Sequence, residues 1–148
     1  MSAQTATRIG GWTFVATGAG HLILSSLLPP STGDLLVVER QMAQARFPMP
    51  PSRSIADLMQ GFSVAMAVLL VAWGLSVLLM TRHDRTPDRA QIGLSLALSL
   101  ALLVTAVLLL PAPPIALMAV ASAAFAVALQ SSSRKPTPTG DAPATARN

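Results

Sequence analysis

One histidine in this sequence lies where its chemistry would matter most. His21 falls within GWTFVATGAGHLILSSLLPP, residues 11 to 30, an apolar stretch long enough to cross a bilayer. A histidine can exchange protons near neutral pH, and an ionisable group inside a membrane span is a functional-site hypothesis by default. A hydrogen bond from the same ring to a neighbouring serine or glutamine is the competing structural interpretation, and the sequence alone leaves both open.

Other polar residues share the depth of His21. If the first span starts at residue 9 on the inner side, a rise of about 1.5 Å per residue places His21 roughly 10 Å below the outer surface. Polar residues from three predicted spans then come to one layer. We therefore predict an outward-facing polar pocket, without an assigned catalytic residue, formed by His21, Ser25, Gln60, Ser63 and Thr105.

Several kinds of chemistry have no residues to support them. The chain has no cysteine, which excludes disulfides, thiolate nucleophiles and cysteine-ligated metal or iron–sulfur sites. The second histidine, His83, lies at a different depth from His21, and the predicted spans hold no carboxylate. We therefore expect no metal and no cofactor. A small multidrug antiporter would also have four helices, but its proton-coupled mechanism requires an acid inside the membrane. The predicted spans have none, so this function is not expected.

The composition indicates that lipid surrounds most of the chain. Of the 148 residues, 52% are hydrophobic and only 11% are charged, against about 25% charged in soluble domains. Four charge-free runs cover residues 9–28, 58–80, 91–110 and 112–130. Each has about the 20 residues that a membrane-crossing helix needs, and helix satisfies the backbone within lipid. The prediction is an all-α integral membrane four-helix bundle, with one transmembrane domain over residues 1–130.

Residues at the ends of these runs predict where helices start and stop. Ser54 and Asp57 have the spacing of a capping box, and Thr86-Pro87-Asp88 would start the third span. Prolines 111, 113 and 114 separate the third span from the fourth. Residues 131–148 are polar, proline-rich and aperiodic, which predicts a disordered tail.

The longest predicted loop spans residues 31–57 and contains the stretch DLLVVERQMAQARF, a fair helix. Ser31 and Asp34 again have capping-box spacing. The helix would lie on the membrane surface or over the mouth of the bundle, or else be a solvated connection.

The distribution of basic residues predicts the orientation. One side of the membrane would hold seven of them: Arg8, Arg82, Arg85, Arg89, Arg134, Lys135 and Arg147. The other side would hold Arg40, Arg46 and Arg53, balanced by three acids in the same loop. We therefore expect both termini in the cytoplasm and the 31–57 loop in the periplasm. The abundance of arginine, alanine and proline is typical of a GC-rich bacterial genome. For a bacterial protein with several membrane-crossing helices, we expect a location in the inner membrane.

Small residues recur at helical spacing in every span, as helices packing in lipid require. The four predicted faces are Gly11, Gly18, His21 and Ser25; Gly61, Ala65, Ala72 and Ser76; Gly93, Ala97 and Ala101; and Ala119, Ser122, Ala123 and Ala126. Besides the lipid bilayer, such faces suit a second copy or another membrane protein as partner. Nucleic acid is not expected, because no basic patch is interleaved with aromatic residues.

A family resemblance rests on Arg8-x-x-Gly11, Gly18-x-x-His21 and QGFSVAMAVLLVAWGL from Gln60 to Leu75. Over about the first 80 residues the chain resembles a family of small uncharacterised bacterial four-helix inner-membrane proteins. It is more distantly similar to DoxX-like and hydroxylaminobenzene-mutase-like proteins, which also begin with a glycine-rich span. The resemblance implies a multi-pass inner-membrane protein and brings no activity or site residues.

Two functions fit the sequence. The first is a non-enzymatic membrane protein: a scaffold, an accessory subunit or a small-ligand binder. The second is a membrane enzyme or carrier for an apolar small molecule, with His21 as an acid–base or hydrogen-bonding group in the outer polar pocket. The sequence favours the first because His21 has no evident partner base or nucleophile, and it does not decide whether the protein is an enzyme.

Overall fold

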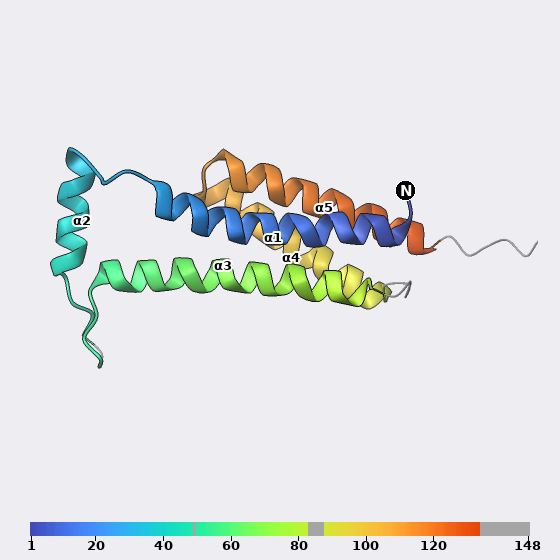
Figure 1. Cartoon of the computed structure of the whole chain (residues 1–148), viewed down its shortest axis with the longest axis horizontal. Helices are drawn as coiled ribbons and strands as arrows, with labels where there is room; N and C mark the ends of the chain where they lie inside the picture. Colours follow the sequence, from blue (N-terminus) through green and yellow to red (C-terminus); the bar gives the residue numbers. More distant parts are fainter. Residues whose placement is uncertain (49, 83–87, 134–148) are drawn as a thin grey trace, which may run out of the picture.

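The computed structural model describes residues 1–48, 50–82 and 88–133, and these residues form five α-helices. The helices are α1 (Ala3–Leu27), α2 (Asp34–Gln44), α3 (Ile55–Met80), α4 (Arg89–Leu109) and α5 (Ala112–Ser133). Four of them are long and run along one axis, while α2 lies across one end (Figure 1). The prediction of an all-α fold is confirmed for the described residues, whose one β-type pairing is an isolated bridge between Arg46 and Ser54.

Local sequence determines where most of the helices begin and end. Ser54 and Asp57 form the predicted capping box, in which each side chain accepts a hydrogen bond from the other residue's backbone N–H. Asp88 itself caps α4, so the helix begins at Arg89, two residues later than the Thr86-Pro87-Asp88 signal predicts. Residues 86 and 87 lie outside the described residues. The prolines separate α4 from α5 as expected. Helix α5 continues to Ser133, three residues into the predicted tail, and residues 134–148 lie outside the described part.

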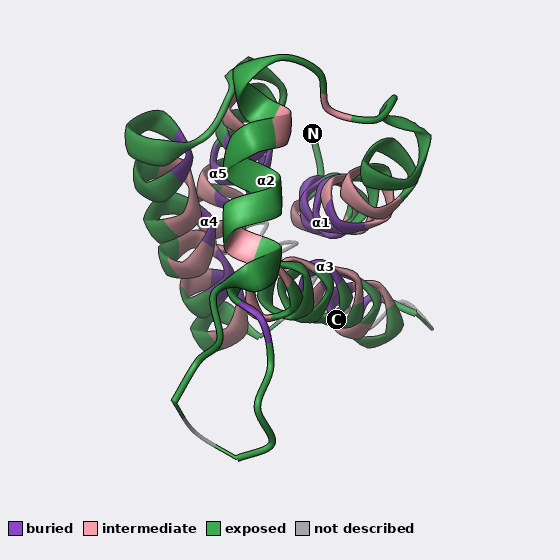
Figure 2. Ribbon diagram, turned by 90° about the vertical axis from the view of Figure 1, so that its left-hand side faces the viewer, coloured by how far each residue is buried: buried purple, intermediate pink, exposed green. Residues whose placement is uncertain are grey.

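The capping box predicted at Ser31 and Asp34 is wrong. Helix α2 begins after Gly33, which has a φ of 62° and makes no side-chain cap, so Ser31 and Asp34 do not form a capping box. A residue with positive φ turns the chain sharply, and glycine adopts this conformation without steric cost. The turn directs α2 across the end of the bundle, where most of its residues are exposed (Figure 2).

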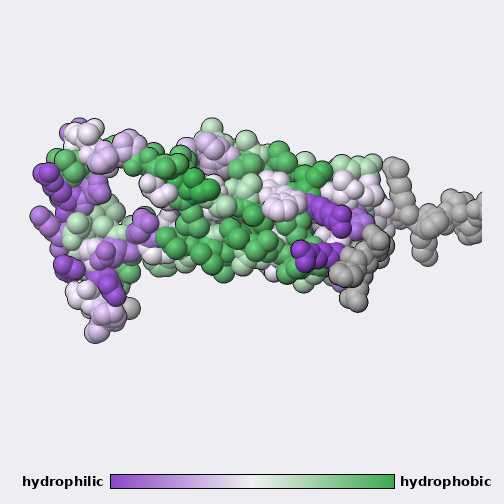
Figure 3. Space-filling view, viewed as in Figure 1, coloured by the Kyte–Doolittle hydropathy of each residue, from purple (hydrophilic) through white to green (hydrophobic). Residues whose placement is uncertain are grey.

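Successive long helices run in opposite directions. Both the N-terminus and the end of α5 lie at one end of the bundle, and α2 lies at the other (Figure 1). Helix α1 packs against α3 on one side and α5 on the other, while α4 packs mainly on α5. Hydrophilic residues gather toward the two ends, and an apolar belt covers the middle (Figure 3). We call the end with α2 the outer end and the end with the N-terminus the inner end.

Among the described residues, three helices are long and apolar enough to cross a membrane: α3, α4 and α5. Only 22% to 33% of their most apolar stretches is buried inside the protein. Large apolar side chains therefore point outward, as in Leu69 and Leu108, which are 69% and 73% exposed. Such a surface is suited to lipid. Helix α1, the first of the four predicted spans, is not among the three.

Helix α1 meets α3 through glycines that let the two backbones approach closely. A Cβ added to Gly74 would lie 2.6 Å from the backbone oxygen of Gly11, and one added to Gly18 would lie 2.5 Å from that of Ala67. On its other side, α1 packs Phe14 against Phe125 of α5, with ring centroids 6.1 Å apart. Gly11 and Gly18 are thus on the packing face predicted for the first span, whereas Ser25 is exposed.

The small-residue faces predicted for the second and third spans do not pack within the chain. A Cβ at Gly61 or Gly93 would meet no atom within 4 Å, and Ala65 and Ala97 are exposed. The core is formed by other residues of these helices, namely Ala67, Leu70, Gly74 and Val77 of α3 and Ile92, Ser95, Ser99 and Ala106 of α4. In α5 the prediction holds only in part, because Ser122 is buried while Ala119 and Ala123 are exposed.

We predict that Gly74→Ala destabilises the bundle by about 1–3 kcal/mol, the usual cost of forcing atoms into a packed interior. The new methyl group would contact backbone atoms of α1, which cannot turn aside as a flexible side chain can. Unfolding in detergent measures the effect. Gly61→Ala is the matched control on the same helix, and we expect it to be neutral or slightly stabilising. Equal stabilities for the two variants would contradict the packing of α1 on α3.

Candidate functional site

The predicted pocket residue His21 meets a serine from another helix. Its Nε2 atom lies 2.6 Å from the Oγ atom of Ser63, and both side chains are partly buried. This hydrogen bond joins α1 to α3 near the outer end. The sequence placed both residues in one layer, and the structure brings them into direct contact.

The antiparallel glycine contacts position this pair. From Gly11 through Gly18 to His21, α1 advances by seven residues and then three. The facing residues on α3 are Gly74, Ala67 and Ser63. Along α3 the contacts therefore move toward the N-terminus by seven residues and then by four. The hydrogen bond thus continues the line of close contacts by one helical turn. We call this line of contacts between α1 and α3, from Gly11 and Gly74 to His21 and Ser63, the seam. Beyond Gly18 and Ala67, the seam changes from close backbone contacts to a hydrogen bond between side chains.

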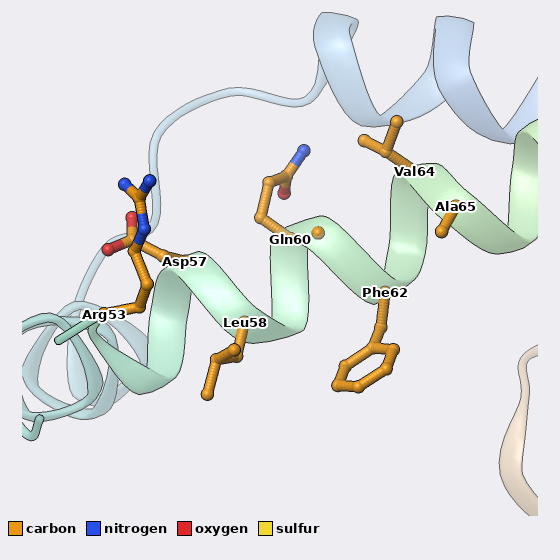
Figure 4. Close-up of a pocket in the computed structure, with 8 residues that line it drawn as sticks. Arg53, Asp57, Leu58, Gln60, Phe62, Val64 and Ala65 are labelled. Atoms are coloured by element: carbon orange, nitrogen blue, oxygen red, sulfur yellow. The ribbon is translucent and has the colours of Figure 1, made fainter. Parts of the chain in front are cut away.

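Gln60 lies one turn from Ser63 on α3, and its amide points toward α1 (Figure 4). It lines an open hollow of about 760 Å³ at the outer end of α3. The other residues lining the hollow are Arg53, Asp57, Leu58, Gly61, Phe62, Val64 and Ala65. The missing side chain of Gly61 contributes to this space, because nothing approaches the position where its Cβ would be.

Of the five predicted pocket residues, the structure joins His21 and Ser63, while Gln60 is exposed and lines a hollow that neither of them lines. Ser25 and Thr105 also lie apart from this pair. The hydroxyl of Ser25 donates to the carbonyl of Leu22, and that of Thr105 donates to the carbonyl of Ala101. Both hydroxyls are therefore satisfied within their own helices, and both residues are exposed. Helix α4 packs on α5 and not extensively on α1 or α3, so Thr105 shares the depth of His21 without being its neighbour.

Polar contacts elsewhere in the bundle were not predicted from the sequence. Ser99 of α4 and Ser122 of α5 form a buried hydrogen bond of 3.1 Å. At the inner end, Gln4 and Arg8 of α1 both donate to the backbone oxygen of Thr81, at 3.0 and 2.9 Å. The recurrence of serine at positions 95 and 99 in an apolar helix was a signal for the first contact. The second depends on a backbone acceptor, which no side-chain pattern identifies.

The chemistry of the site is limited to hydrogen bonding and proton exchange. Ser63 and His21 are within the distance of a nucleophile and its general base. A working pair of this kind also has a third group that orients the base; among the described residues no such hydrogen bond to His21 occurs, and none form a cluster of three potential metal ligands. Backbone N–H groups in the middle of α3 already bond within the helix and cannot serve an oxyanion.

Comparisons of the chain with protein-family models, curated proteins and solved structures found no match.

We predict that His21→Ala and Ser63→Ala each cost about 1 kcal/mol of stability, and that the double variant costs less than the sum of the two. Polar contacts between membrane helices have coupling energies of about 0.6 kcal/mol and up to about 1.7. A double-mutant cycle in detergent measures this coupling. Ser25→Ala and Thr105→Ala are controls with hydroxyls bonded inside their own helix, and we expect changes below about 0.5 kcal/mol. Additive losses would contradict the contact.

Proposed function

We propose that the protein is a four-span integral membrane protein of a bacterial inner membrane, with both termini in the cytoplasm. Helix α1 has 25 residues, a length of about 37 Å at 1.5 Å per residue, and it lies between two apolar helices. Ile23, Leu24 and Leu27 of α1 are each more than half exposed, which suits lipid contact. The inner end carries Arg8, Arg82 and Arg89, in agreement with the positive-inside rule.

A cysteine assay tests this topology. Cysteines at Gln44, at the end of α2, and at Ser133, at the end of α5, should react with a membrane-impermeant reagent from opposite sides. The native chain has no cysteine, so each variant reports one position. Labelling of intact and of opened cells or vesicles measures the sidedness. Reaction of both positions from the same side would remove the four-span arrangement.

We infer a non-enzymatic role for this protein, as a scaffold, an accessory subunit or a small-ligand binder. One observation carries the inference: His21, the ionisable residue within the predicted spans, uses a ring nitrogen to hold α1 against α3. A histidine in this position acts as a link between helices. On α4, Gly93 meets no atom within 4 Å at its Cβ position, and Ala97 and Ala101 are exposed, so this small-residue face suits a partner helix or a second copy.

The alternative is a membrane enzyme or carrier for an apolar small molecule. The 2.6 Å contact of His21 with Ser63 favours it, because a base and a hydroxyl are then already paired. The hollow lies on the same helix as Ser63, although neither His21 nor Ser63 is among the residues that line it. In this alternative His21 would take the proton of Ser63 or of the bound molecule, and the amide of Gln60 would help to orient that molecule. The lack of an orienting group for the ring weighs against it among the described residues.

Amide variants distinguish the two roles. His21→Asn and His21→Gln can replace the hydrogen bond of a neutral imidazole, and neither amide titrates near neutral pH. If His21 is structural, we expect the better-fitting amide to recover much of the stability that His21→Ala loses, and to retain the cellular phenotype of the native protein. Unfolding in detergent and the phenotype are measured on the same variants. A stable amide variant without function would favour proton chemistry.

A further inference from the structure

The inner end of the seam between α1 and α3 concentrates positive charge. Arg8 donates from one guanidinium nitrogen to the backbone oxygen of Thr81 at 2.9 Å. That oxygen belongs to the peptide bond between Thr81 and Arg82, so the backbone of a second arginine lies next to the guanidinium group of Arg8. Both arginines are exposed, and Arg8 retains further N–H donors.

Little negative charge offsets them within the described residues. Asp34, Glu39 and Asp57 lie toward the outer end, and Asp88 accepts a hydrogen bond from the N–H of Ala90. The C-terminal end of α3 contributes about half a negative charge through its dipole, which is less than the two guanidinium groups supply.

An aromatic side chain continues the same face of α1 into the apolar belt. Trp12 follows Arg8 by four residues, as Arg8 follows Gln4, so the three share one side of the helix. Trp12 is 60% exposed and lies about 6 Å further along the axis than Arg8. Tryptophan at this level is typical of the membrane interface, where the ring contacts lipid and its N–H reaches polar groups.

We propose that this corner of the bundle, formed by Arg8, Trp12 and Arg82, binds the headgroup of an anionic phospholipid. The planar fork of an arginine matches a phosphate group, and a second exposed arginine next to Thr81 in the chain adds positive charge at the same corner. The indole lies at the depth of the lipid's glycerol region. The site rests on the proposed placement of α1 in the membrane, and it adds an anionic lipid of the cytoplasmic leaflet as a partner.

Tryptophan quenching by brominated lipids tests the proposal. In a Trp73→Phe variant Trp12 is the remaining tryptophan, because the chain has two. The protein is reconstituted into phosphatidylcholine vesicles that contain brominated phosphatidylglycerol or, for comparison, brominated phosphatidylcholine. We expect stronger quenching by the anionic lipid. An excess of soluble glycerol phosphate should leave this preference unchanged, which distinguishes a lipid headgroup from a site for free phosphate.

Charge variants then locate the site. In the same Trp73→Phe background, Arg8→Gln and Arg82→Gln should each weaken the preference about fivefold, the effect of removing about 1 kcal/mol of attraction per basic residue. Arg82→Gln leaves the hydrogen bond of Arg8 to Thr81 in place, so it keeps the test valid if Arg8→Gln does not fold. Arg40→Gln, on α2 at the outer end, is the matched control and should keep the preference.

The outcomes separate this proposal from the one on which it rests. Equal quenching by the two lipids, or a preference that survives both Arg8→Gln and Arg82→Gln, would overturn the headgroup site alone. Displacement by glycerol phosphate would overturn the lipid as the ligand. An absence of quenching by either lipid would overturn the membrane placement of α1, and the headgroup site with it.

Discussion

The close approach of α1 to α3 is the constraint on which the other features depend. In lipid, helices gain little from burying apolar surface against each other, so packing over small residues and hydrogen bonds must hold them together. Gly74 and Gly18 permit backbone contact because each lacks the atom that would meet a carbonyl oxygen of the facing helix. With the backbones this close, side chains at the two ends of the seam reach across it, as His21 does to Ser63 and Arg8 to the carbonyl of Thr81.

The central position of α1 explains why it is the least apolar of the long helices. It packs against helices on two sides, whereas α3 and α4 each expose most of their apolar surface. A helix packed against others on two sides can carry polar side chains there if their hydrogen bonds are satisfied. The hydroxyls of Thr7, Thr13 and Thr17 donate to carbonyls within α1 itself, so they add no unsatisfied group. The low hydropathy of α1 thus goes together with satisfied hydroxyl groups and packing on two sides.

Helix ends and the face of α1 were predictable, because local residues determine them. The capping box of Ser54 and Asp57 and the prolines before α5 act within a few residues of sequence. The heptad spacing of Gly11 and Gly18 fixes one side of α1. Which helix lies against that side is a matter of tertiary structure. Depth placed Thr105 in the same layer as His21, but only the order of helices shows that α4 lies elsewhere.

Small residues mark surfaces where close approach is possible, and sequence cannot say which of them the chain itself uses. Within α3, Gly74 packs against α1 while Gly61 faces open space, although both lie in helical patterns of small residues. The difference follows from the register of the seam. Its glycine contacts have no directional bonds of their own and would tolerate small shifts along the axis.

Hydrogen bonds at both ends remove this freedom. His21 to Ser63 near the outer end and Arg8 to Thr81 at the inner end are separated by 13 residues of α1, about 20 Å along the helix. A shift by one residue would break both bonds at once and leave partly buried polar groups without these partners, which costs free energy. The polar residues at the ends of the seam therefore fix the alignment of two helices that the glycines only bring together.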